Sequence, residues 1–145
     1  MASQLATADS TAPIRVEVLL VEDSPLLREA LTACFAHRPD IVFSAHACGA
    51  EAAVEQLRGR HFDLAVVDLE LQQGTGFDVL AYLASLEPSH RALPLVLTNH
   101  AYPLCRRRAL ALGAEYFFDK SMQFDEAIAA IETEAQRVLM RADAC

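Results

Sequence analysis

The fold is decided by the stretch Leu64-Ala65-Val66-Val67-Asp68-Leu69-Glu70-Leu71. It begins with four apolar residues, two of them valine, a composition typical of a strand that is buried on both faces. The run ends at Asp68, and the polar segment Gln72-Gln73-Gly74-Thr75-Gly76 follows. Ligands bind at the carboxyl ends of strands in open α/β sheets, so Asp68 is a candidate functional carboxylate. The alternative role for Asp68 is to cap the turn that follows it.

Segments of two kinds alternate along the chain on either side of this strand. Apolar and β-branched runs predict strands at 14–21, 41–47, 64–68, 93–98 and 116–118. Apolar residues at helical spacing predict helices at 25–37, 50–59, 77–86, 103–112 and 124–138. Five strands that alternate with five helices through short connections predict a parallel sheet with right-handed crossovers and helices on both faces.

The predicted fold class is α/β, a flavodoxin-like (βα)5 doubly wound sheet with five parallel strands in the order 2-1-3-4-5. At 145 residues, the chain is long enough for one domain with a substantial core and too short for two ordinary domains. The predicted folded domain covers residues 14–141. Residues 1–13 are expected to form a disordered N-terminal extension, and residues 142–145 a C-terminal tail.

Composition excludes several classes of function. No apolar run approaches the roughly 18 residues that cross a bilayer, and no secretory signal is recognisable, so we expect a cytoplasmic location without membrane contact. The formal net charge of −8 disfavours direct binding to nucleic acid. The four cysteines have no C-x-x-C or His/Cys ligand spacing, which disfavours a zinc site.

Polar side chains stand at the predicted strand ends. Glu22 and Asp23 follow the first strand, Asp68 ends the third, Thr98 ends the fourth, and Lys120, the single lysine, follows the fifth. Since the first and third strands flank the switch point of this topology, their carboxylates are expected to converge. Converging carboxylates repel one another unless a cation lies among them, and a site of oxygen ligands suits Mg²⁺. Carboxylate nucleophile, magnesium, lysine and hydroxyl together indicate phosphoryl transfer.

These residues occur in motifs that can be compared with a known family. The motifs are Glu22-Asp23 within Leu20-Val21-Glu22-Asp23-Ser24, Asp68 with Gly76 eight residues later, Thr98 in Leu97-Thr98-Asn99, and Lys120 in Phe117-Phe118-Asp119-Lys120. In these motifs, and over about residues 14–141, the chain resembles the receiver domain of two-component response regulators. The resemblance implies a phospho-accepting regulator, not an enzyme, whose own catalysis is limited to phosphoryl transfer and slow autodephosphorylation.

The resemblance also implies a role for each site residue. Asp68 would accept a phosphoryl group from a histidine kinase or a histidine phosphotransferase. Thr98 and Lys120 would contact the phosphoryl oxygens, and Thr98 and Phe117 would act as switch residues. Mg²⁺ would be held by Glu22, Asp23, Asp68 and the backbone carbonyl of Glu70.

The same resemblance implies how the chain would pass on its signal. No output domain is recognisable after the last predicted helix, so the chain resembles the stand-alone receivers. These signal by relaying the phosphoryl group or by binding a downstream protein at the face of the fourth helix, fifth strand and fifth helix, as monomers or phosphorylation-dependent dimers. The triplet Arg106-Arg107-Arg108 on the fourth helix is predicted to be a set of solvated charges and not a dedicated docking site.

Three residues depart from the family pattern. Gln72 and Ser121 stand where proline is common, and Asn99 is bulkier than the usual residue beside Thr98. Glu70 and His100, two residues beyond Asp68 and Thr98, are predicted to pair across the entrance to the site.

Two other functions remain open at this level. One is a haloacid-dehalogenase-like phosphatase that uses Asp68 as its nucleophile, although that family places the nucleophile on the first strand. The other is a pseudo-receiver, a binding module that works without phosphorylation. Turnover of p-nitrophenyl phosphate distinguishes the first from a receiver, and phosphorylation by acetyl phosphate distinguishes the second.

Overall fold

Five parallel strands form one sheet in the predicted order, β2-β1-β3-β4-β5. The computed structural model describes residues 14–144. The strands are β1 (Val16–Val21), β2 (Ile41–Ala47), β3 (Leu64–Val67), β4 (Leu93–Thr98) and β5 (Tyr116–Asp119). The helices are α2 (Pro25–Cys34), α3 (Ala50–Gly59), α4 (Gly76–Ala84), the short 3-10 helix η1 (Pro88–His90), α5 (Pro103–Ala111) and α6 (Phe124–Ala144).

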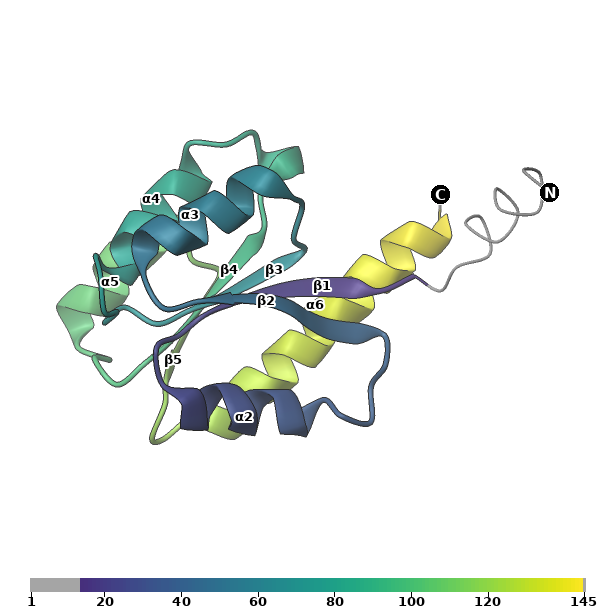
Figure 1. Ribbon diagram of the computed structural model, residues 1–145, viewed down its shortest axis with the longest axis horizontal. Coiled ribbons are helices and arrows are strands. Elements are labelled where there is room, and N and C mark those ends of the chain that lie inside the picture. The colour runs from purple at the N-terminus through teal and green to yellow at the C-terminus, as the bar shows by residue number, and fades with distance from the viewer. Residues whose placement is uncertain (1–13, 145) are drawn as a thin grey trace.

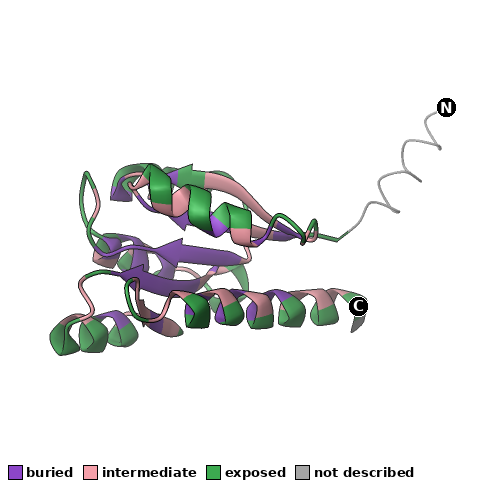
Figure 2. Cartoon of the chain, turned by 90° about the horizontal axis from the view of Figure 1, so that it is seen from below, coloured by how far each residue is buried: buried purple, intermediate pink, exposed green. Residues whose placement is uncertain are grey.

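Helices cover both faces of the sheet, so the strands form the middle layer (Figure 1). On one face, α2 and α6 pack on side chains that include Val18, Leu20 and Val66. On the other face, α3, α4 and α5 pack on two further apolar clusters. Figure 2 shows that the central strands are almost entirely buried, whereas the helices expose their outer sides. The fold class predicted from the sequence is therefore confirmed.

The register of the central strands brings the predicted site residues together. Val21, the last residue of β1, pairs with Val67, the last residue of β3. Asp68 continues this pairing, because its N–H donates to the carbonyl of Val21 at 3.0 Å. All four residues of β3 are buried, so the backbone that positions Asp68 is held from both sides and both faces.

Gly76 allows the loop after β3 to fold tightly back on this strand end. Its N–H donates to the carbonyl of Leu69 at 2.9 Å, and a Cβ at this position would collide with the backbone carbonyl of Asp68. Thr75 and Asp78 then form a capping box that begins α4. The glycine eight residues after Asp68 is therefore required by close approach of two backbone segments.

Element boundaries differ from the sequence prediction mainly at helix ends. The helix α2 stops at Cys34, three residues before His37, because the chain continues in shorter turns in which Phe35 N–H donates to Thr32 O. The helix α6 continues to Ala144 since no helix breaker follows Val138, so residues 142–144 are helical and do not form a separate tail. The predicted disorder of residues 1–13 lies outside the described residues. No helix in the described part of the chain is long and apolar enough to cross a membrane.

Candidate functional site

Three carboxylates meet at the carboxyl ends of β1 and β3. Glu22, Asp23 and Asp68 each offer one oxygen, and these atoms lie within 4.8 Å of one another. Glu22 and Asp68 are buried, whereas Asp23 is half-buried. The group consists of hard oxygen donors with one side open to water, which is the ligand set that Mg²⁺ binds in proteins. The geometry of these three residues therefore fits the predicted magnesium site.

Lys120 places a positive charge against two of these carboxylates. Its Nζ lies 2.7 Å from Asp68 Oδ2 and 2.8 Å from Glu22 Oε1. The loop after β5 positions the side chain, because Lys120 N–H donates to the carbonyl of Thr98 at 3.0 Å. Burial alone lowers the pKa of Lys120, but hydrogen bonds to Asp68 and Glu22 and the charges of these carboxylates outweigh it and raise the pKa. The ammonium group therefore stays charged in this site.

Glu22 is the most deeply buried of the three acids, and its environment is mixed. Burial raises its pKa, and this effect exceeds the opposing hydrogen bonds from Lys120 and from the Ser24 N–H, which donates to Oε2 at 2.9 Å. The charge of Asp68 raises the pKa further. Ser24 also begins α2, since its hydroxyl accepts from the Leu27 N–H. Ser24 thus both binds the Glu22 carboxylate and caps the start of α2.

Thr98 and Phe117, the predicted switch residues, are both buried. Thr98 ends β4, and its hydroxyl accepts a hydrogen bond from the His100 N–H at 3.1 Å. Phe117 lies on the neighbouring strand, where it pairs with Val96. Arg106 of α5 contacts Phe117 twice, by a hydrogen bond of 3.3 Å to its carbonyl and by a guanidinium 5.8 Å from the ring centroid.

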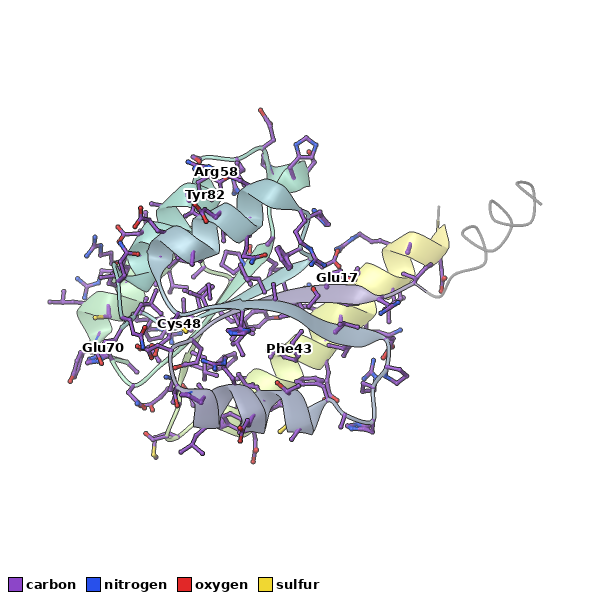
Figure 3. All side chains as sticks on the ribbon, in the orientation of Figure 1. Glu17, Phe43, Cys48, Arg58, Glu70 and Tyr82 are labelled. Carbon is purple, nitrogen blue, oxygen red and sulfur yellow. The ribbon has the colours of Figure 1, made fainter. Side chains whose placement is uncertain are left out.

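Glu70 and His100 form the predicted pair at the entrance. Glu70 Oε2 lies 3.1 Å from His100 Nε2, and the His100 ring is tilted against Tyr102 with centroids 6.0 Å apart. Figure 3 shows Glu70 at the same end of the sheet as Cys48, opposite Glu17. The pair joins the loop after β3 to the loop after β4, so it spans the approach to Asp68 from this side.

A hydrogen-bond network at the rim was not predicted. Arg28 of α2 donates to the carbonyl of Glu22 at 3.3 Å and lies 3.8 Å from Cys48 Sγ. Gln72 N–H donates to the carbonyl of Cys48 at 3.2 Å, a bond that the proline common at this position cannot make. The network links the loops after β1, β2 and β3. Its acceptors are largely backbone atoms, so nothing in the side-chain pattern indicated it.

The loop after β5 is stabilised by side chains where the family commonly has proline. Asp119 Oδ1 accepts from both the N–H and the hydroxyl of Ser121, at 2.8 and 2.7 Å. Gln123 Oε1 accepts from the Asp119 N–H at 3.0 Å. Asn99, the third departure, is exposed and lines a shallow hollow together with Lys120 and Ser121. Local hydrogen bonds therefore shape this loop.

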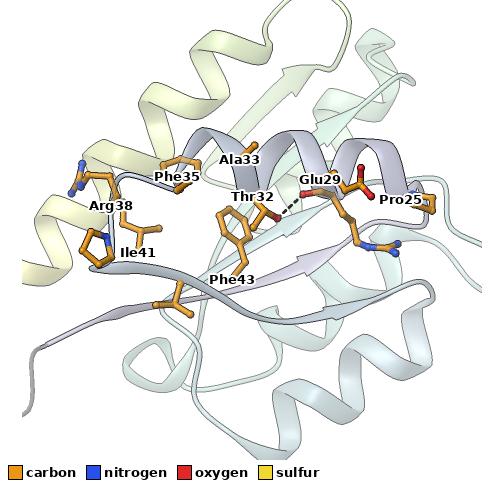
Figure 4. A pocket seen from close by; sticks show the side chains of 12 residues that line it. Pro25, Glu29, Thr32, Ala33, Phe35, Arg38, Ile41 and Phe43 are labelled. Carbon is orange, nitrogen blue, oxygen red and sulfur yellow. Dashed lines mark hydrogen bonds between the residues drawn. The ribbon is translucent and has the colours of Figure 1, made fainter.

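A further hollow on the surface lies away from these residues. It measures about 680 Å³ and runs between α2 and β2 (Figure 4). Its lining includes Phe35, Ile41 and Phe43. The hydroxyl of Thr32, which also lines the hollow, donates a hydrogen bond to the carbonyl of Arg28 at 2.6 Å. None of the predicted site residues lines it, so the candidate chemistry is confined to the carboxyl edge of the sheet.

Comparison with known proteins identifies the family. The profile of the response regulator receiver domain matches residues 18–132, and the chain belongs to this family. A protein-glutamate methylesterase/protein-glutamine glutaminase of Burkholderia lata is 32% identical over 110 residues, which are 76% of this chain and 30% of that protein. The nitrate/nitrite response regulator NarL of Escherichia coli is 25% identical over 127 residues, 88% of this chain and 58% of that protein.

Solved structures agree with this assignment. The two-component response regulator of the LuxR family from Aurantimonas sp. SI85-9A1 superposes with a TM-score of 0.74 at 26% identity, over 84% of this chain and 86% of that one. The chain spans less than two thirds of the length of the curated relatives described above. Receiver domains of two-component systems are phospho-accepting signalling domains, which is the coarse function that the family establishes.

Proposed function

We propose that Asp68 accepts a phosphoryl group from the phosphohistidine of a histidine kinase or a histidine phosphotransferase. The observation that supports this most directly is the contact of Lys120 Nζ with both Asp68 and Glu22, beside the third carboxylate of Asp23. A buried nucleophilic carboxylate, a fixed ammonium group and an acidic metal site are the parts that phosphoryl transfer needs, because its catalysis is mainly positioning and charge neutralisation.

Mg²⁺ is the cofactor in this proposal. Glu22, Asp23, Asp68 and the backbone carbonyl of Glu70 would hold it, and it would neutralise negative charge that develops on the phosphoryl oxygens. Asp68 supplies the carboxylate oxygen that forms the new bond to phosphorus while the phosphorus–nitrogen bond of the donor breaks. The imidazole leaves with that electron pair and is protonated. Lys120 and the Thr98 hydroxyl bind the phosphoryl oxygens, which replace Asp68 as the partner of the Lys120 ammonium.

In this proposal, phosphorylation of Asp68 is also the step that sends the signal to a downstream partner. Thr98 turns toward the phosphoryl group, Phe117 moves into the space that this frees, and the face of α5, β5 and α6 changes shape for a downstream protein or a second copy of the chain. Relay of the phosphoryl group to a further histidine is the other route. The proposed location of the chain is the cytoplasm.

Acetyl phosphate with Mg²⁺, followed by intact mass measurement, tests the proposal. We expect the mass of one phosphoryl group to be added to the parent and to be absent in Asp68→Asn. The matched control Asp125→Asn, an exposed carboxylate on α6, should be phosphorylated as the parent is. A folded parent that gains no mass would be a pseudo-receiver, and sustained turnover of p-nitrophenyl phosphate would indicate a phosphatase.

A further inference from the structure

Helix α5 concentrates positive charge on an acidic chain. It contains Arg106, Arg107 and Arg108, and no acidic residue occurs from Asn99 to Ala114, although the formal net charge is −8. Within residues 14–144, none of these three guanidinium groups lies within 4.0 Å of a carboxylate. The described part of the chain therefore leaves three neighbouring positive charges without a neutralising partner.

All three arginines are exposed, as predicted for solvated charges, and two of them also contact aromatic rings. The Arg108 guanidinium lies 4.1 Å from the centroid of the Phe77 ring, and Arg106 contacts both the ring and the carbonyl of Phe117. A guanidinium group that already rests on a ring loses little freedom when it binds, and its planar fork matches a carboxylate. These are favourable conditions for binding acidic side chains.

Apolar surface lies next to the arginines. Leu104 is 72% exposed and Tyr102 is 61% exposed, and Leu104, Arg107 and Arg108 share one side of the helix by their spacing. A groove of about 260 Å³ adjoins the start of α5, and its apolar lining is Leu69, Leu71, Phe77, Tyr102 and Cys105. Phe77 lines the groove and also supports Arg108, so Arg108 lies next to a groove whose own lining includes the Glu70–His100 pair.

We propose that this surface binds a short acidic, amphipathic helix of a partner protein. Apolar side chains of that helix enter the groove and cover Leu104, and its carboxylates meet Arg107 and Arg108, the helix-in-groove mode of recognition. The proposal rests on the proposed function, since it names the chemistry of a downstream partner, and it assigns that partner to α5 and the loops before α4 and α5 instead of the face of α5, β5 and α6. Glu70 and His100 also line the groove, so the bound helix contacts the pair at the entrance to the phosphorylation site.

The distribution of charge on the chain favours a short acidic peptide over a second copy of the chain or nucleic acid. At physiological salt, screening limits electrostatic attraction to about 8 Å, so a short segment responds mainly to the local charge of α5. A second copy of the chain brings a further net charge of −8, and nucleic acid brings a dense row of phosphates, so both are repelled by the rest of the molecule. The apolar groove beside the arginines also suits a peptide side chain better than a phosphodiester.

The probe for this proposal is a synthetic helical peptide of about 15 residues with leucine and phenylalanine on one side and glutamate on the other. Binding is measured on the isotope-labelled full chain by amide chemical shifts, with and without acetyl phosphate and Mg²⁺. We expect shifts at α5 and the start of α4, and a Kd that weakens as salt is added. Arg107→Glu and Leu104→Ser should each weaken binding at least about tenfold. The control Arg141→Glu, the same charge change at an exposed site on α6, should stay within about twofold.

Several results would contradict the proposal that this surface binds an acidic helix. These are equal binding of a peptide with lysine in place of glutamate, shifts confined to another face, or equal weakening by Arg141→Glu. A dimer in sedimentation that Arg107→Glu abolishes, or α5-centred binding of a DNA duplex, would assign the surface to those partners instead. Arg107→Glu should still be phosphorylated at Asp68. A parent chain that is phosphorylated but does not bind the peptide rejects the surface alone, whereas a parent chain that binds the peptide but is not phosphorylated supports the surface and rejects the proposed function alone.

Discussion

Two ion-paired groups lie beside Asp68, and they differ most in their exposure to water. In the first, Lys120 contacts Asp68 and Glu22 at 2.7 and 2.8 Å, and the three side chains are only 12%, 6% and 2% exposed. In the second, Glu70 and His100 are 3.1 Å apart but 74% and 37% exposed. Each group joins loops that follow different strands, so each crosses the same edge of the sheet.

The difference in burial predicts a difference in role. Removing one partner of a buried ion pair leaves uncompensated charge in a poorly solvated place and is strongly destabilising, whereas an exposed pair contributes little to stability. We therefore expect the Lys120 group to affect both folding and phosphoryl transfer. The Glu70–His100 pair should affect access to the site with almost no effect on folding.

The largest effect is expected for Lys120→Met, which breaks the buried group. It leaves Glu22 and Asp68 next to each other without a counter-charge, so the free energy of unfolding without Mg²⁺ should fall by about 3 kcal/mol. Urea unfolding in the presence of a chelator measures this. Arg60→Met is the control, because Arg60 and Glu17 are also 2.8 Å apart but 45% and 30% exposed, and it should cost less than about 1 kcal/mol. Equal costs for the two variants would show that burial does not distinguish the two kinds of pair.

Asp23→Asn is expected to separate metal binding from folding. Loss of this carboxylate should weaken Mg²⁺ binding at least about tenfold, or about 1.4 kcal/mol, in calorimetry, and should block phosphorylation by acetyl phosphate. Stability without metal should stay level or rise, since one of three repelling charges is removed. Asp125→Asn is again the matched control. A clear loss of metal-free stability in Asp23→Asn would make Asp23 a structural residue.

Glu22→Gln tests the buried group through pH. The folded state raises the Glu22 pKa above 4.5, chiefly by burial, so it binds this proton more tightly than the unfolded chain does. Stability of the parent therefore falls as pH rises from about 4.5 through the folded pKa, while the glutamine variant lacks this dependence. Urea unfolding at a series of pH values without Mg²⁺ should show that the stability of the variant increases relative to that of the parent as pH rises over that range. Parallel curves would mean that Lys120 fully compensates the burial of Glu22.

The smallest effect on stability, and a distinct effect on lifetime, is expected when the exposed pair is broken. Glu70→Ala and His100→Ala should each admit water to the phosphorylated site and speed phosphate loss about three- to fivefold, the range that a pair worth up to about 1 kcal/mol allows. The double variant should be no faster than the faster single variant, because the two residues act as one unit.

Release of phosphate from the purified phosphoprotein measures this lifetime. His61→Ala is the control, since His61 pairs with Asp63 at 3.3 Å on the surface and should leave the lifetime unchanged. Slower decay in Glu70→Ala would contradict the role of the Glu70–His100 pair in excluding water and would indicate that Glu70 orients the attacking water as a base.

Much of the fold was predictable because its signals are local. The strands 41–47 and 93–98 agree with β2 and β4 at both ends, since β-branched runs bounded by turn residues mark a strand without reference to its neighbours. The positions of the polar residues at the strand ends were predictable for the same reason, because each follows directly on an apolar run in the sequence. The family motifs then supplied the resemblance that the comparisons confirmed.

The contacts of the arginines were not predictable. Arg28 bonds to the backbone of Glu22, and Arg106 and Arg108 rest on the rings of Phe117 and Phe77. A long side chain on a helix surface can reach many partners, and its sequence neighbours do not indicate which one it meets. The end of α2 was similarly missed, because buried Phe35 and the turn after Cys34 stop the helix in the absence of a breaker.

The sequence by itself determined the order of strands and helices, the acids at the strand ends and the glycine that the turn after β3 requires. Only the tertiary structure decided that Lys120 meets two carboxylates at once, that the Glu70–His100 pair is exposed, and that α5 carries unneutralised charge beside a groove. The physical reason is the range of the forces involved. Hydrophobic periodicity and capping act within a few residues of the chain, whereas ion pairing depends on distance and burial, which are set when strands 45 or more residues apart pack together, as β1 and β3 do at Val21 and Val67.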